Sequence, residues 1–106
     1  MAYLNVTAAE FKKKLKEAKE PILIDVRAPE EKVEGDIEGS VLMNMMEADF
    51  PMKIEKLDKS KEYFLFCRSG GRSASACEYM NNLGFQTCYN LEGGIRAWNN
   101  ENEVEK

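Results

Sequence analysis

The sequence contains no histidine, and this absence removes several chemistries at once. Without an imidazole there is no Ser-His-Asp or Cys-His nucleophile, no zinc site that uses histidine, and no side chain whose ordinary pKa suits a general base near neutral pH. Cysteines are few: Cys67, Cys77 and Cys88 form an odd set at wide spacing, which suits neither a disulfide framework nor a CxxC motif. We expect reduced thiols in a reducing compartment, and neither a metal nor a cofactor.

An excess of basic charge and long apolar runs are also missing. The chain of 106 residues carries 15 basic and 19 acidic residues, a net charge of −4, whereas a nucleic-acid-binding domain needs a basic face. No apolar run approaches the roughly 18–20 residues of a membrane span, and the first residues lack the pattern of a signal peptide. We therefore expect a cytoplasmic protein that binds neither nucleic acid nor membrane, with a single domain over residues 1–106 and a polar, frayed tail at residues 99–106.

Apolar strand-like runs alternate with helical patterns along the chain. Strands are expected at residues 22–26, 40–44, 63–66 and 87–89. Helices are expected after a capping box that begins at Thr7, over residues 73–83, and as short turns near 29–32 and 95–98, with a weaker helical signal over 45–59 that Pro51 interrupts. This alternation predicts an α/β fold with a mainly parallel sheet.

The segment that carries chemistry is the one that follows the third expected strand. An apolar run ends in Cys67, a loop with two glycines and two arginines follows, and a helix then begins. Ligands of parallel α/β sheets bind beyond the carboxyl ends of the strands. Gly70 and Gly71 allow the loop to curl so that its N–H groups turn inward, while Arg68 and Arg72 add positive charge. Such surroundings favour a thiolate, so the loop predicts a cysteine nucleophile that acts on a small anion without a base; the alternative is a buried, inert cysteine.

Other polar residues receive structural interpretations. Asp25 and Arg27 lie at the end of a buried strand, where we expect an ion pair that fixes the following loop, with substrate contact as the alternative. The acidic stretch at residues 30–38 holds five acids and one lysine, and a solvated face is expected there, with the repulsion of acidic partners or the docking of basic ones as the alternative. Asp36 lies in that stretch and is a candidate residue for the rim of the site.

Four segments in the right order resemble single-domain rhodaneses, a family of sulfurtransferases. The resemblance spans roughly residues 5–98 and is carried by IDVR with PEE, GDIEGS, CRSGGRS, and LGF followed by NLEGGIRAW. It implies a five-stranded parallel sheet flanked by helices. Asp36 and Glu38 stand where family members often carry His and Pro, which bears on the preferred donor more than on the reaction.

The resemblance also implies a reaction and a set of site residues. Cys67 would attack the outer sulfur of thiosulfate and release sulfite, leaving a persulfide that an acceptor thiol or cyanide then takes. Arg72 would hold the oxyanion part of the substrate and Arg68 would add charge at the rim. The implied partners are a small anionic sulfur donor and a thiol acceptor, either a small molecule or a thioredoxin-like protein. The loop that would bind the donor comprises Arg68, Ser69, Gly70, Gly71, Arg72 and Ser73.

Three alternatives stay open. The same persulfide could belong to a carrier that receives its sulfur from another protein in a relay. A phosphatase or arsenate reductase also uses a cysteine in an anion-binding loop, but only four residues separate Cys67 from Arg72, one fewer than in tyrosine-phosphatase-type loops, which suits a compact sulfur-centred group better than a phosphate ester. The third alternative is an inactive, regulatory rhodanese-like domain, although such domains often lack the cysteine.

Overall fold

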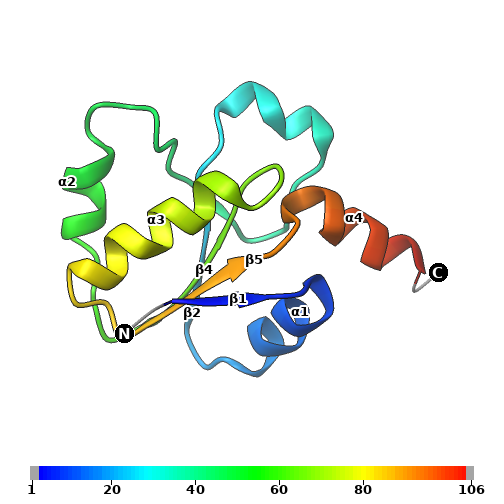
Figure 1. Cartoon of the computed structure of the whole chain (residues 1–106), viewed down its shortest axis with the longest axis horizontal. Coiled ribbons are helices and arrows are strands. Elements are labelled where there is room, and N and C mark those ends of the chain that lie inside the picture. Colours follow the sequence, from blue (N-terminus) through cyan, green and yellow to red (C-terminus); the bar gives the residue numbers. More distant parts are fainter. Residues whose placement is uncertain (1–2, 105–106) are drawn as a thin grey trace.

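The computed structural model describes residues 3–104 and contains a five-stranded parallel sheet with helices on both faces (Figure 1). The strand order is β1-β5-β4-β2-β3, and all of these neighbours pair in parallel. Because β4 is the central strand, the residue that follows it lies at the middle of the carboxyl edge of the sheet. The strands are β1 (Leu4–Val6), β2 (Pro21–Asp25), β3 (Val41–Leu42), β4 (Glu62–Phe66) and β5 (Thr87–Leu91).

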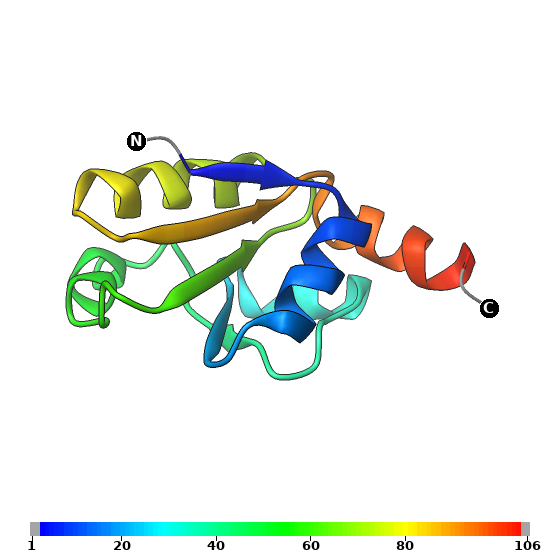
Figure 2. The ribbon, with the colours of Figure 1, turned by 90° about the horizontal axis from the view of Figure 1, so that it is seen from below.

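The helices divide between the two faces of the sheet (Figure 2). In β4, Phe64 packs on one face with Phe11 and Ile95, while Leu65 packs on the other with Ile54 and Met80. Burial on both faces explains why this strand is an unbroken apolar run without alternation. Within residues 3–104 no helix is long and apolar enough to span a membrane. The helices are α1 (Ala8–Glu17), the 3-10 helix η1 (Pro29–Glu34), α2 (Phe50–Glu55), α3 (Gly71–Asn82) and α4 (Gly94–Val104).

The α/β prediction and the five-stranded parallel sheet are confirmed, while several local predictions need correction. The pattern of residues alone missed β1, because the strand has only three residues, Leu4–Val6, and is too short to show a periodic pattern. Pro51 does not interrupt a helix but lies in the first turn of α2. A proline is accepted there because an N–H in the first turn has no intrahelical partner.

The expected frayed tail at residues 99–106 is wrong for residues 99–104, where α4 continues to Val104. The Asn99 side-chain amide donates a hydrogen bond to the Glu34 carbonyl at 3.0 Å, which ties the second turn of α4 to the end of η1. Once the first turns are packed, a polar stretch without proline or glycine can extend a helix at little cost. Residues 105 and 106 lie outside the described residues.

The start of α4 packs directly against the backbone that follows β4 (Figure 1). The Ile95 N–H donates to the Cys67 carbonyl at 2.9 Å. Gly94 has a φ of 63°, and a Cβ atom at this position would lie 2.3 Å from the Arg68 carbonyl oxygen. Only glycine therefore permits this approach, which fixes the backbone of the loop at its first residue.

We expect Gly94→Ala to destabilise the protein, with Gly71→Ala as the matched control. The left-handed backbone alone costs a non-glycine residue about 1–2 kcal/mol, and the overlap with Arg68 adds to this cost. Gly71 begins α3 without a positive φ, and a Cβ atom there meets no atom within 4 Å, so its variant should be neutral or slightly stabilised. Urea unfolding of both variants measures the difference, and equal free energies of unfolding would contradict the proposed contact.

Candidate active site

Cys67 follows the last residue of β4, and only 1% of its surface is exposed. Its sulfur accepts hydrogen bonds from the Gly70 N–H at 3.1 Å, the Ser73 N–H at 3.4 Å and the Ser73 hydroxyl at 3.3 Å. Gly70 has a φ of 102°, a left-handed conformation in which the loop curls before α3 begins. The sulfur therefore lies in a ring of donors that favours a negative charge.

Two buried cysteines of this protein have pKa values shifted in opposite directions. Burial raises the pKa of Cys67, but the hydrogen bonds from Ser73 and from the N–H groups of Gly70 and Ser69 outweigh it, and the pKa falls below its ordinary value. Burial also raises the pKa of Cys77, and the neighbouring Cys88 thiol raises it further. Cys77 and Cys88 lie in the core on the α3 side of the sheet, and the hydrogen-bond donors of the loop set Cys67 apart from Cys77.

Both arginines of the loop form ion pairs with η1. Arg72 makes two hydrogen bonds to the Glu31 carboxylate, at 2.7 and 2.8 Å, and Arg68 contacts the Glu34 carboxylate at 3.0 Å. The hydrogen bonds from Arg72 lower the pKa of Glu31 to about 2, so the pair stays charged near neutral pH. The expectation of a merely solvated acidic face is wrong for Glu31 and Glu34, because the fold brings segments distant in sequence to the same edge of the sheet.

A buried ion pair positions η1 beside the loop. Asp25 and Arg27 are fully buried, and the Arg27 guanidinium donates two hydrogen bonds of 2.9 Å to the Asp25 carboxylate. The same guanidinium donates to the carbonyls of Glu31 and Gly35 at 3.1 and 3.0 Å. This geometry fits the structural interpretation of Asp25 and Arg27, because the pair holds the backbone of the segment that carries Glu31.

The Asp36 carboxylate is hydrogen-bonded by residues close to it in sequence. Its carboxylate accepts hydrogen bonds from the Ile37 N–H at 2.8 Å, the Ser40 hydroxyl at 3.0 Å and the Lys32 ammonium at 3.3 Å. Burial raises the pKa of Asp36, but these three donors together hold it below the ordinary value. The turn after η1 and Lys32 therefore supply the hydrogen bonds of this carboxylate, which also lies 3.8 Å from the Arg27 guanidinium.

Asn90 is the residue of the site that sequence reasoning missed. It is 2% exposed on β5, and its side chain accepts a hydrogen bond from the Ser73 hydroxyl while donating to the Gly70 carbonyl at 3.2 Å. Ser73 is itself fully buried, whereas Ser69 and Gly71 lie on the exposed side of the loop. A polar amide between Tyr89 and Leu91, near the end of a strand, was the available signal.

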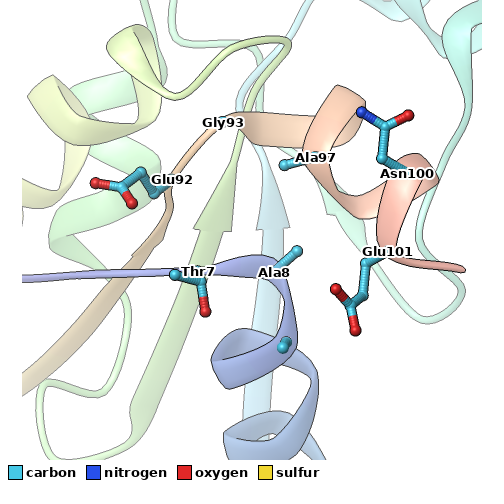
Figure 3. Close-up of a pocket in the computed structure, with 8 residues that line it drawn as sticks. Thr7, Ala8, Glu92, Gly93, Ala97, Asn100 and Glu101 are labelled. Atoms are coloured by element: carbon cyan, nitrogen blue, oxygen red, sulfur yellow. The ribbon is translucent and has the colours of Figure 1, made fainter. Parts of the chain in front are cut away.

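A separate hollow of about 440 Å³ lies between the start of α1 and the face of α4 (Figure 3). Its lining includes Ala8, Gly93 and Ala97, with the carboxylates of Glu92 and Glu101 at its border. Two carboxylates disfavour an anionic ligand. The hydrogen-bond donors around the Cys67 sulfur, and not this hollow, therefore form the candidate site for an anionic ligand.

The comparisons with known proteins agree on one family. The family model described as "Rhodanese-like domain" matches residues 7–101. The chain is 45% identical over 101 residues to "Putative sulfurtransferase YtwF" of Bacillus subtilis (strain 168), with 95% of each chain covered. It is 30% identical over 93 residues to a "Sulfurtransferase" of Allochromatium vinosum, covering 88% of this chain and 85% of the relative.

Solved structures show the same architecture. A rhodanese-like domain protein from Staphylococcus aureus superposes with a TM-score of 0.77 at 35% identity, with 90% of each chain covered. The polysulfide-sulfur transferase homodimer of Wolinella succinogenes gives a TM-score of 0.77 at 30% identity, covering 94% of this chain and 75% of the other. Given the fold and the extent of these matches, the chain belongs to the rhodanese-like domain family, which includes the sulfurtransferase relatives named above.

Proposed function

We propose that this protein is a thiosulfate sulfurtransferase that moves a sulfane sulfur through a persulfide on Cys67. The observation that carries the proposal is the ring of donors around the Cys67 sulfur, which lowers the pKa of this thiol although the residue is buried. A thiolate is the form that attacks sulfur, and it needs no histidine here because hydrogen bonds stabilise it. Membership of a sulfurtransferase family supports the same reaction.

The proposed reaction has two displacements at sulfur. The Cys67 thiolate attacks the outer sulfur of thiosulfate, the sulfur–sulfur bond of the donor breaks, and sulfite leaves with the electron pair. The persulfide that remains carries its negative charge on the outer sulfur, close to the N–H groups of the loop from Arg68 to Ser73. An acceptor thiolate or cyanide then attacks the outer sulfur, and the electron pair returns to Cys67. We propose the cytoplasm as the location, because the reaction needs a reduced thiol.

A specific observation favours a second candidate function, that of a persulfide carrier loaded by another protein. Glu31 and Glu34 neutralise Arg72 and Arg68, so the loop attracts a doubly charged donor less than its sequence suggests. Arg72 could hold the oxyanion of thiosulfate, the role that the resemblance implies, only through donors not engaged by Glu31, or after the pair opens. A protein-bound persulfide, which carries less charge, does not depend on these arginines.

Treatment with thiosulfate tests the first proposal. We expect intact-protein mass spectrometry to show one added sulfur atom on the wild type, removed again by dithiothreitol, and none on Cys67→Ala. Cys77→Ala is the matched control, because Cys77 is buried in the core with Cys88, and it should gain the sulfur like the wild type. If Cys67→Ala gained the sulfur equally, the proposed nucleophile would be wrong.

The thiolate itself can be titrated through its alkylation. The rate of iodoacetamide labelling of Cys67 should rise with pH and reach its midpoint below the value of about 8.5 for a free cysteine. Ser73→Ala should raise this midpoint by about 1 pH unit, since one hydrogen bond to the anion is lost while the Ser73 N–H remains. Ser75→Ala, on an exposed position of α3, is the control. An unchanged midpoint in Ser73→Ala would show that the hydroxyl does not stabilise the thiolate.

Charge removal at Glu34 separates the two candidate functions. Glu34→Gln frees Arg68, and a partly exposed charge interaction of roughly 0.5–1 kcal/mol corresponds to a two- to fivefold rise in kcat/KM for thiosulfate. Glu30→Gln removes an equal charge from an exposed position of η1 and controls for net charge. Negligible thiosulfate turnover in every variant, with rapid sulfur loading of the wild type by a cysteine desulfurase, would instead support the carrier.

A further inference from the structure

The Ser73 hydroxyl has one proton and three acceptors within reach. Its oxygen lies 3.3 Å from the Cys67 sulfur, 3.4 Å from the Gly70 carbonyl oxygen and within a shorter hydrogen bond of the Asn90 side-chain oxygen. A hydroxyl donates only one hydrogen bond at a time. The strength of the hydrogen bond from Ser73 to the sulfur therefore depends on how strongly the other two acceptors attract the same proton.

The orientation of the Asn90 amide is fixed by a group that can only accept. The Gly70 carbonyl lies 3.2 Å from the Asn90 amide nitrogen, and the Asn5 side-chain oxygen lies 2.8 Å from the same nitrogen. Turning the amide over would bring its oxygen against the Gly70 carbonyl oxygen, two acceptors without a proton between them. The Asn90 oxygen must therefore face Ser73 and attract its hydroxyl proton.

We propose that Asn90 is a positioning residue that competes with Cys67 for the Ser73 hydroxyl proton and so limits how strongly Ser73 stabilises the ionised sulfur. With Cys67 as a thiol, its S–H can donate to the Ser73 oxygen while Ser73 donates to Asn90, so that every group is paired. With Cys67 as a thiolate, Ser73 must turn its proton to the sulfur, which leaves the buried Asn90 oxygen without a donor. Asn90 therefore favours the thiol form. The inference rests on the proposed role of Cys67 as the nucleophile.

A limit on how strongly Ser73 stabilises the thiolate has a chemical use. The intrinsic reactivity of a thiolate toward sulfur falls as its pKa falls, and the best attacking thiol has a pKa near the ambient pH. The backbone N–H groups of Gly70 and Ser73 alone already favour the anion. By accepting the Ser73 hydroxyl proton, Asn90 prevents a further fall in the pKa of Cys67. The sulfur then remains ionisable, and its thiolate is not too weak a nucleophile.

The other charged or titratable groups around Cys67 stay the same in the variants that test this inference. Arg72 and Cys77 of α3 interact electrostatically with Cys67. Asp25, the last residue of β2, and Arg27 are paired with each other, while Glu92, after β5, and Arg96, in the first turn of α4, are exposed. A shift that follows substitution of the uncharged Asn90 therefore reports on its hydrogen bonds.

The test compares the midpoint of Cys67 alkylation by iodoacetamide in Asn90→Leu, in Ser73→Ala and in the double variant. We expect Asn90→Leu to lower the midpoint by ~0.5–1 pH unit, the opposite direction from Ser73→Ala, which gives ~3- to 10-fold more thiolate at a pH below both midpoints. In the Ser73→Ala background Asn90→Leu should cause no further shift, because the shared proton is gone. Asn5→Ala, which removes a partner of the Asn90 nitrogen but leaves its oxygen, should keep the wild-type midpoint.

An unchanged or raised midpoint in folded Asn90→Leu, or an equal shift in the presence and absence of the Ser73 hydroxyl, would overturn the inference. Asn90→Val, which suits a strand and also removes both polar atoms, replaces the leucine variant if that one does not fold, as judged by circular dichroism. Thiosulfate loading of the same samples distinguishes a failure of this inference from a failure of the proposed function. Loading that persists with an unaltered titration rejects only the role of Asn90, whereas absent loading in every sample, wild type included, rejects the proposed function.

Discussion

The structure depends on a short loop whose N–H groups point at one sulfur atom at the end of the central strand. Gly70 and Ser73 supply these donors from the backbone, so they are fixed by the path of the chain and do not depend on a rotamer. Their effect opposes burial, which alone would keep the Cys67 thiol neutral, as it does for Cys77. In this way the loop lowers the pKa of Cys67 without a histidine, because the stabilisation of the anion comes from the geometry of the backbone.

The scaffold around the loop holds this geometry from two sides. The Ile95 N–H and the close approach of Gly94 fix the carbonyls of Cys67 and Arg68 from the α4 side. The buried pair of Asp25 and Arg27 fixes η1 on the other side. Much of the buried polar structure at this edge of the sheet therefore serves to place a few backbone atoms, as preorganisation requires.

The sequence predicted the elements whose signals are local. The unbroken apolar run of β4, the capping box of α1 and the glycines after Cys67 each have a direct physical explanation, and these indicated the fold class and the candidate nucleophile. The exposed strand β1 and the continuation of α4 depend on tertiary partners, Tyr89 for Leu4 and Glu34 for Asn99. Linear patterns carry no information on such partners.

The electrostatics of the site departs furthest from what the sequence indicated. Arg68 and Arg72 are read from the chain as free positive charges, because no acid lies near them in sequence, yet the fold places Glu31 and Glu34 against them. What remains to favour the anion at Cys67 is mostly dipolar: amides, one hydroxyl and the end of a helix. Dipoles hold a single ionised sulfur well but attract a distant dianion weakly, since their fields fall off faster with distance than that of a full charge. In the proposed function, the arrangement that favours the thiolate therefore leaves the choice between a small dianionic donor and a protein-bound persulfide to the neighbouring acids.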